Sequence, residues 1–267
     1  MAELSCSRIR RLVVCTLLCA GAVAASAAAP AATDAQALLA ASDAIRNPGQ
    51  PFSLAVSLTE YRAGKQTDAN SLQVYSRADP QGGQFRTLVR FVAPARDLDK
   101  LMLKSGNELW FYDPASRASV RISPQQRLLG QAANGDVVTV NFAQAYRARL
   151  EQQEEVQDGD RQLRQCDRLA LEAATPDVTY HSVQMWLDHA NQRPVKARFF
   201  SESGRLLKTA FYRRYREELG VQRPTEIVII DGLDPSLVTV MRYGEFVARE
   251  VPESWLQRDY LPRFRPE

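Results

Sequence analysis

The sequence predicts a mainly β fold of the α+β class, in which one large, curved antiparallel sheet forms an incomplete barrel and a few helices form a lid. Three observations predict it. Alternating apolar and polar runs recur at hairpin spacing along most of the 267 residues. Turn-forming Gly, Pro, Asn and Asp separate these runs. Segments with helical periodicity are few, and so wide a sheet rarely stays flat.

The amino-terminal segment has the three parts of a secretory signal peptide. Three arginines at positions 8 to 11 precede an apolar run from Leu12 to about Ala25, which a cluster of small residues follows. This run is shorter than the ~20 residues that span a bilayer. We therefore expect residues 1–28 to be cleaved and residues 29–267 to form a single soluble domain in the periplasm.

Cleavage would leave one cysteine in the mature chain, because Cys6, Cys15 and Cys19 belong to the signal segment. No small residue precedes Cys15 or Cys19, as the modified cysteine of a lipoprotein would require. Cys166 then has no partner for an internal disulfide. Its neighbours would not lower its pKa, so we expect a buried structural thiol and not a reactive one.

The charge balance argues against nucleic acid as a partner. The whole chain carries a formal net charge of +3, which falls towards neutral when the amino-terminal arginines are removed. A nearly neutral chain gives no sign of a concentrated basic surface that would bind a polyanion. Roughly 240 mature residues suit one large β domain. We find no linker or repeat and expect a monomer.

The mature chain is expected to open with a helix from Asp34 to Arg46. Thr33 can cap its amino end, and the sequence Asn-Pro-Gly at positions 47–49 ends it. Its apolar residues share one face. This helix would either close one end of a filled core or plug the mouth of a cavity, and the sequence does not distinguish the two.

The remaining chain reads as a succession of strands. Apolar and polar residues alternate from Phe52 to Tyr61, and turn signals such as Asp-Pro-Gln-Gly-Gly at positions 79–83 follow the early strands. The expected strands cover residues 52–61, 72–76, 85–93, 100–104, 108–113, 119–122, 147–156, 163–173, 182–187, 195–200, 206–213, 225–230 and 238–246.

Further helices are expected in three places. Pro124 favours the first turn of a helix that runs to Ala132, and its narrow apolar stripe suits a small lid over the sheet. Shorter helices are expected from Asn141 to Tyr146 and from Pro252 to Arg258. So little helix cannot cover the inner face of so wide a sheet, which favours a cavity for an apolar ligand. A well-filled barrel core is the alternative.

Residues 90–136 carry motifs that resemble those of a known family. The motifs are R-F-x-x-P-A-R-D at residues 90–97, L-W-F-Y-x-P at 109–114, and R-I-x-P-x-Q-R-L-L-G-Q-A-x-N-G-D at 121–136. Further matching segments lie at residues 186–188, 193–197 and 203–209. This pattern resembles the LolA-like family of periplasmic outer-membrane lipoprotein-sorting proteins. The resemblance implies an incomplete barrel whose helical lid covers a hydrophobic cavity for acyl chains.

The candidate ligand-binding residues follow from the expected strand registers and the lid. A shift of one residue would exchange the two faces of a strand, so each of these residues could also be plain core. The candidates are Leu54, Val56, Leu58, Val89, Phe91, Met102, Trp110 and Tyr112 on the sheet and Leu128 and Leu129 in the lid.

Charged and turn residues of the same motif form a second group of candidates. They are Arg90, Arg96 and Asp97 near one hairpin and Asn134, Gly135 and Asp136 after the lid. These residues would either form a solvated edge with ion pairs, or serve as a hinge for the lid or a contact for a membrane partner.

The sequence offers little material for catalysis. His181 and His189 belong to no metal-binding spacing, and no nucleophile elbow, P-loop or dinucleotide fingerprint is present. We expect neither an enzyme nor a cofactor or metal. An envelope hydrolase would need a histidine in the cavity.

The resemblance therefore implies a periplasmic carrier or chaperone that moves a lipid or an acylated lipoprotein from the inner towards the outer membrane. Its partners would be this cargo and an inner-membrane transporter, such as one of the resistance-nodulation-division class, with transient membrane contact. The alternative is a periplasmic sensor or accessory protein that binds lipids or lipoproteins and regulates a membrane partner. The sequence leaves the cargo open.

Overall fold

The computed structural model of the protein describes residues 34–265 except residues 82 and 107. The predicted signal peptide, residues 1–28, lies outside the described residues, and so does Thr33. Within the described part, no helix is long and apolar enough to cross a membrane.

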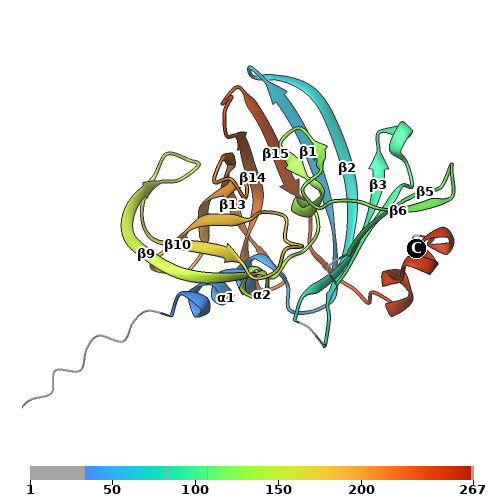
Figure 1. Ribbon diagram of the computed structural model, residues 1–267, viewed down its shortest axis with the longest axis horizontal. Coiled ribbons are helices and arrows are strands. Elements are labelled where there is room, and N and C mark those ends of the chain that lie inside the picture. The colour runs from blue at the N-terminus through green and yellow to red at the C-terminus, as the bar shows by residue number, and fades with distance from the viewer. Residues whose placement is uncertain (1–33, 82, 107, 266–267) are drawn as a thin grey trace, which may run out of the picture. The chain divides into compact units, whose positions relative to one another are not determined.

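One antiparallel sheet of 14 strands dominates the fold, as the sequence predicts (Figure 1). It consists of two meanders, β1 to β6 and β9 to β15, in which each strand pairs with the next along the chain. The first and last long strands, β1 and β15, pair with each other and join the two meanders. The strands are β1 (Phe52–Arg62), β2 (Lys65–Ala78), β3 (Phe85–Ala93), β4 (Leu101–Ser105), β5 (Glu108–Asp113), β6 (Ala118–Arg121), β9 (Tyr146–Gln157), β10 (Leu163–Ala173), β11 (Ser182–Asp188), β12 (Pro194–Phe200), β13 (Leu206–Glu218), β14 (Val221–Asp231), β15 (Leu237–Tyr243) and β16 (Val247–Ala248).

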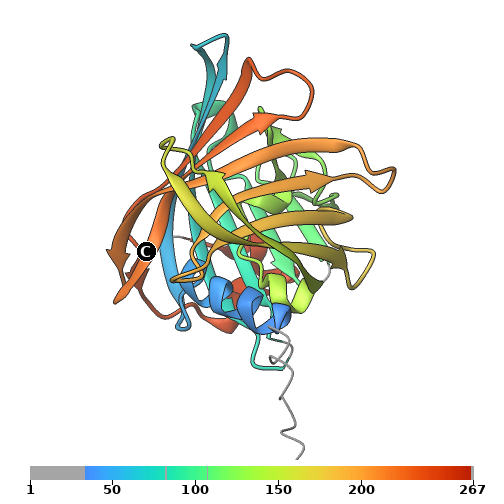
Figure 2. The same cartoon turned by 90° about the vertical axis from the view of Figure 1, so that its left-hand side faces the viewer.

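The sheet is curved and open. Its edge strands are β6 and β9, which lie at opposite ends of the strand order, and the short β16 pairs with β1 beside β15. In both views the long strands bend around a concave side (Figures 1 and 2). The expected incomplete barrel is thereby confirmed.

Two helices cover one end of the concave side (Figure 2). Helix α1 (Ala35–Arg46) is confirmed at the expected place, but Asp34 caps it by accepting hydrogen bonds from the backbone N–H groups of Gln36 and Ala37. The predicted short helix at residues 141–146 is α2 (Phe142–Ala145), and it packs against α1.

The predicted lid helix from Pro124 to Ala132 is wrong. This segment forms a two-stranded hairpin of β7 (Arg127–Leu129) and β8 (Ala132–Ala133), followed by a 3₁₀ turn from Asn134 to Asp136. The reason lies at Gly130, whose φ of +53° suits a tight turn and ends any helix. A Cβ at this position would also collide with Thr239.

The register of the first meander assigns each residue to one face of the sheet. A row across β2 to β5 points to the concave core and consists of Val74, Val89, Met102 and Phe111. The neighbouring row points to the outer face and consists of Tyr75, Leu88, Leu103 and Trp110.

The carboxyl-terminal segment covers this outer face, on the right-hand side of Figure 1. It forms two 3₁₀ helices, η3 (Glu253–Leu256) and η4 (Arg258–Arg263), where the sequence predicts one helix from Pro252 to Arg258. Trp255 packs edge-on against Tyr75 at 5.3 Å and against Phe264 at 5.0 Å between ring centroids. The sheet therefore carries a hydrophobic cluster on each side.

Candidate functional site

A cavity of about 210 Å³ lies on the concave side of the sheet. Its lining is mainly apolar, because strands from both meanders turn alternate residues towards it. These lining residues include Phe52, Leu54, Val56 and Val74 from β1 and β2, Phe199 and Ala210 from β12 and β13, and Ile227, Ile229 and Met241 from β14 and β15. A mainly apolar pocket of this kind suits an apolar ligand.

The lining reaches solvent beside the β4–β5 hairpin. Glu108 from the start of β5, Gln144 from α2, and Thr175 and Asp177 from the loop after β10 line the cavity and are exposed. These four residues are called the mouth residues below. The mouth lies where loops and a short helix meet, which are the parts of a fold that move most readily.

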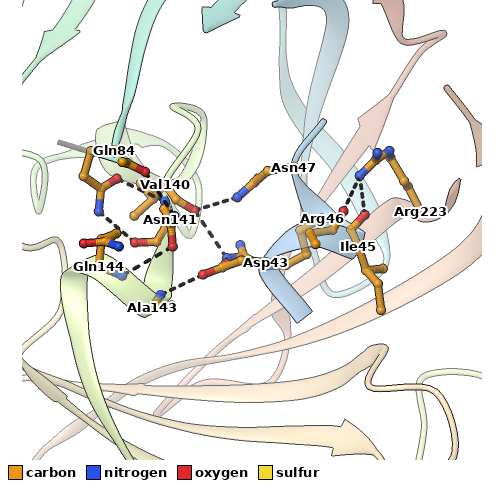
Figure 3. Close-up of polar contacts among 12 residues, drawn as sticks. Asp43, Ile45, Arg46, Asn47, Gln84, Val140, Asn141, Ala143, Gln144 and Arg223 are labelled. Carbon is orange, nitrogen blue, oxygen red and sulfur yellow. Dashed lines mark hydrogen bonds and ion pairs between the residues drawn. The ribbon is translucent and has the colours of Figure 1, made fainter. Parts of the chain in front are cut away.

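The segment from Val137 to Ala145, called the closing segment below, contributes most of its residues to the cavity lining. Figure 3 shows its polar contacts with the end of α1. The Ala143 N–H donates to Asp43 Oδ2 at 2.7 Å, and Asn47 Nδ2 donates to the Val140 carbonyl at 3.0 Å. Arg46 pairs with Asp43 and lies over the Phe142 ring, 4.2 Å from its centroid. Polar contacts therefore hold the closing segment against α1.

Arg223 of β14 holds the other side of α1 (Figure 3). Its Nη1 donates to the carbonyls of Ala44 at 3.0 Å and Ile45 at 2.7 Å. The last carbonyls of a helix lack partners within the helix and carry its negative dipole end, so a guanidinium suits them. Arg223 is only 3% exposed, and its burial lowers its pKa, against the raising effect of Glu218.

A buried ion pair of Lys208 and Asp136 forms one wall of the cavity. Lys208 Nζ also donates to the Gln131 carbonyl at 3.2 Å, and the Tyr180 hydroxyl donates to Asp136 Oδ1 at 2.8 Å. Burial lowers the pKa of Lys208, although Asp136 acts in the opposite direction. The pair thus connects β13 to the turn after the β7–β8 hairpin.

The ten residues predicted to bind the ligand fall into three groups. Leu54 and Val56 line the cavity. Six more belong to the surrounding core cluster without lining the cavity: Leu58, Val89, Phe91, Met102, Leu128 and Leu129. Trp110 and Tyr112 lie in the outer cluster, because the true register of β5 turns Leu109 and Phe111 inwards. The predicted inner and outer faces of β5 are therefore exchanged in the structure.

The predicted hinge or partner residues separate into two places. Arg90 pairs with Asp99 at 2.7 Å. The exposed Arg96 pairs with Asp68, and the half-buried Asp97 pairs with Lys100. None of these lines the cavity.

The other three, Asn134, Gly135 and Asp136, follow the β7–β8 hairpin at the cavity wall. Gly135 and Asp136 line the cavity, and Asn134 is buried and donates to the Ser123 carbonyl at 3.1 Å. A Cβ at Gly135 would collide with the Thr179 side chain. Only this half of the predicted group therefore lies at the candidate site.

Several residues of the site were not predicted from the sequence. They are Arg46, Tyr146, Tyr180, Lys208, Tyr212 and Tyr243. A signal was available for Lys208, because Lys208, Ala210 and Tyr212 alternate along one strand and so share a face. A lysine in line with inward-facing residues indicates a buried partner. Tyr180 follows a loop whose path no periodicity predicts.

The described residues hold no group of three or more His, Cys, Asp or Glu side chains arranged for a metal ion. His189 Nδ1 lies 2.9 Å from an oxygen of Asp167, and neither His181 nor His189 lines the cavity. Cys166 is 1% exposed among Trp186 and Val195, and burial raises the pKa of its thiol to about 12. The thiol is buried, as the sequence predicts.

The chain is similar to several proteins of known structure. A family model described as an uncharacterized protein matches residues 83–263. A search of curated proteins found no match. Among solved structures, the chain is similar to a LolA superfamily protein from Nitrosomonas europaea, with 33% sequence identity and a TM-score of 0.76. That match covers 86% of this chain and 100% of the other.

Two further solved structures share the fold at lower identity. A DUF1329 family protein from Desulfovibrio piger matches with 19% identity and a TM-score of 0.72, over 85% of this chain and 97% of that one. An outer membrane lipoprotein-sorting protein domain from Vibrio parahaemolyticus matches with 18% identity and a TM-score of 0.71, over 86% and 98%. The three solved structures therefore share the overall fold of this chain.

Proposed function

The chain belongs to the LolA superfamily, and from this membership we propose that it is a periplasmic carrier that binds the acyl chains of a lipid or lipoprotein. It moves this cargo from the inner towards the outer membrane. The observation that carries the proposal is the cavity, which is lined mainly by apolar side chains and enclosed between the curved sheet and α1. Each methylene that leaves water for such a site gains ~0.8 kcal/mol.

Loading requires the cavity to widen. A volume of 210 Å³ is below the roughly 300–1,000 Å³ of typical ligand pockets and is small for a long acyl chain. Hydrogen bonds from Ala143 N–H to Asp43 and from Arg46 to the Val140 carbonyl hold the closing segment in place. Hydrogen bonds of this kind contribute about 1 kcal/mol each, so a bound chain can offset their loss. We infer that the segment 137–145 and α1 move apart when cargo enters.

The place of action follows from the predicted signal peptide at residues 1–28, which would deliver a mature domain of residues 29–267 to the periplasm. There the carrier receives cargo at the inner membrane by transient contact and from a transporter, such as one of the resistance-nodulation-division class. It acts as a monomer and without chemistry of its own. Neither His181 nor His189 is among the lining residues, which supports binding over catalysis.

Native mass spectrometry of the protein purified from its own periplasm tests the proposal. We expect one lipid or acylated polypeptide per chain, which extraction then identifies. Ala210→Leu narrows the cavity from its β13 wall and should reduce this occupancy, whereas Ala115→Leu, in an exposed turn, should not. A chain that stays empty after incubation with envelope lipids and lipoproteins would refute the carrier function.

A further inference from the structure

Two tyrosines stand out in the apolar lining. Tyr212 is the third inward residue of β13 after Lys208 and Ala210, and Tyr243 ends β15. Both line the cavity. Tyr212 on β13 pairs with Ile227 on β14, and Ile227 pairs with Met241 on β15. Tyr243 lies two residues after Met241, so the two tyrosines project from the same face of the sheet.

The hydroxyl groups of these two tyrosines have no hydrogen-bond partner in the described part of the chain. Other buried tyrosines have one: Tyr146 donates to the Tyr180 carbonyl at 3.1 Å, and Tyr180 donates to Asp136 at 2.8 Å. Tyr212 is only 6% exposed, and Tyr243 is half-buried. A buried phenol usually finds a partner, so an unpaired phenol that faces a cavity indicates a group that the ligand supplies.

The surrounding charges limit what that group can be. Arg46 lies close to both phenols, where it opposes the rise in pKa that burial causes in Tyr212 and Tyr243. Asp43 balances the charge of Arg46, and Asp136 balances that of Lys208. Because both cations are already paired, they leave no net positive charge to offset the desolvation of an anionic ligand group, whereas a neutral oxygen needs only a hydrogen-bond donor.

The third donor in this region is Arg46 itself. Its Nε is buried without a partner, while its Nη2 serves Asp43 and the Val140 carbonyl. Polar groups therefore gather around Arg46, Tyr212 and Tyr243, while the lining as a whole is mainly apolar. A long ligand would lie with its hydrocarbon part along the apolar lining and an oxygen group among the phenols.

We propose that the ligand carries a neutral oxygen group, such as a hydroxyl or carbonyl, which the hydroxyls of Tyr212 and Tyr243 bind at the cavity wall. The inference rests on the proposed function and narrows its cargo. A plain saturated acyl chain ends in a methyl group and leaves both phenols unpaired. An oxygenated chain or a polycyclic alcohol satisfies them.

Competition against a fluorescent lipid probe tests this inference with matched pairs. The pairs are 1-dodecanol against dodecane, for a linear ligand, and cholesterol against cholestane, for a polycyclic one. Dodecanoate has a chain of the same length but carries a charged carboxylate head. The alkane is the more hydrophobic member, so apolar burial alone would favour it. Two phenol hydrogen bonds should instead make the alcohol of at least one pair stronger by on the order of tenfold.

The variant Tyr212→Phe with Tyr243→Phe should abolish this preference and keep the affinity for the alkane. The substitution removes no internal hydrogen bond, so the fold should persist, and each single variant provides an intermediate case. Tyr260→Phe, in the outer cluster, is the matched control. The pair with the larger preference identifies the linear or polycyclic class.

Three results would count against the inference. Equal affinities within both pairs would overturn it while leaving the carrier function intact. Stronger binding of dodecanoate than of dodecanol would overturn the neutral character of the group. Failure of the probe and all competitors to bind would instead refute the proposed function, and the inference with it.

Discussion

Lys208 and Asp136 form a buried ion pair between residues 72 positions apart in the sequence. Their side chains are 5% and 11% exposed. Asp136 also accepts hydrogen bonds from the Ala133 N–H at 2.7 Å and from the Tyr180 hydroxyl at 2.8 Å. This one carboxylate therefore joins β13, the β10–β11 loop and the turn after the β7–β8 hairpin at the cavity wall.

Asp136→Asn should destabilise the protein by about 3–5 kcal/mol, because it leaves the buried ammonium of Lys208 without its counter-charge. Lys208→Met should cost less, since Asp136 keeps its bonds from Tyr180 and Ala133. The double variant should recover part of the loss. Urea denaturation of all four proteins measures the coupling, and strictly additive effects would contradict it.

Arg223→Met should loosen α1. The variant leaves the carbonyls of Ala44 and Ile45 without their donor, at a cost of about 1.5–3 kcal/mol for a charged hydrogen-bonding group. Hydrogen exchange of the α1 amides should rise. Arg216 stands opposite Arg223 in the β13–β14 register but is exposed, so Arg216→Met is the control. Equal rates of hydrogen exchange in both variants would argue against stabilisation of α1 by Arg223.

Gly135→Ala should destabilise the protein by about 1–3 kcal/mol, because its new methyl group would overlap the Thr179 side chain at the cavity wall. Gly49→Ala serves as the control, since a Cβ at that position meets nothing within 4 Å. Thermal unfolding compares the two. A second change, Thr179→Gly, should restore part of the stability lost in Gly135→Ala, and no recovery would mean that the strain has another source.

The elements that local chemistry determines were predictable from the sequence. Strict alternation in β1, and turn signals such as Asp-Pro-Gln-Gly-Gly before β3, gave the strands and their antiparallel order. The segment from Pro124 to Ala132 was mispredicted as a helix, because Pro124 favours a first helical turn while the decisive Gly130 needs a positive φ. A proline can begin either a turn or a helix, and only the tertiary contacts of the segment decide which of the two forms.

The site was less predictable than the fold, since it depends on register. In β5, Leu109, Trp110, Phe111 and Tyr112 are all apolar or aromatic, so alternation does not reveal which face is inner. The answer comes from the pairing of Met102 with Phe111 and from the carboxyl-terminal segment that covers Trp110. Both are long-range contacts.

Trp255→Ala should separate stability from ligand binding. Trp255 packs against Tyr75 and Phe264 on the outer face, so its removal should cost about 3–5 kcal/mol. The cavity lies on the other face, and its affinity for a fluorescent lipid should stay unchanged at temperatures where the variant is folded. A parallel loss of affinity, measured by probe titration, would show that the outer cluster shapes the cavity.

Raising the pH above 10 should destabilise the protein through its buried phenols. Burial raises the pKa of six tyrosines above the ordinary value of 10.0: Tyr75, Tyr146, Tyr180, Tyr212, Tyr215 and Tyr243. Above pH 10 the unfolded chain loses these protons while the folded chain keeps them. Their contribution is therefore complete below pH 10 and is lost as the pH rises, by up to about 1.4 kcal/mol per pH unit for each phenol.

Three lysines act in the opposite direction to the six tyrosines: Lys104, Lys196 and Lys208. Burial lowers their pKa, so the folded state releases these protons first and gains stability as the pH approaches the ordinary lysine value of 10.5. Replacing Tyr212 and Tyr243 with phenylalanine should remove about a third of the tyrosine slope, as two of six groups. Urea midpoints between pH 9 and 11 measure it. An unchanged slope in the double variant would mean that these two phenols ionise as readily in the folded chain as in the unfolded one, which would place them in contact with water and not in an apolar cavity.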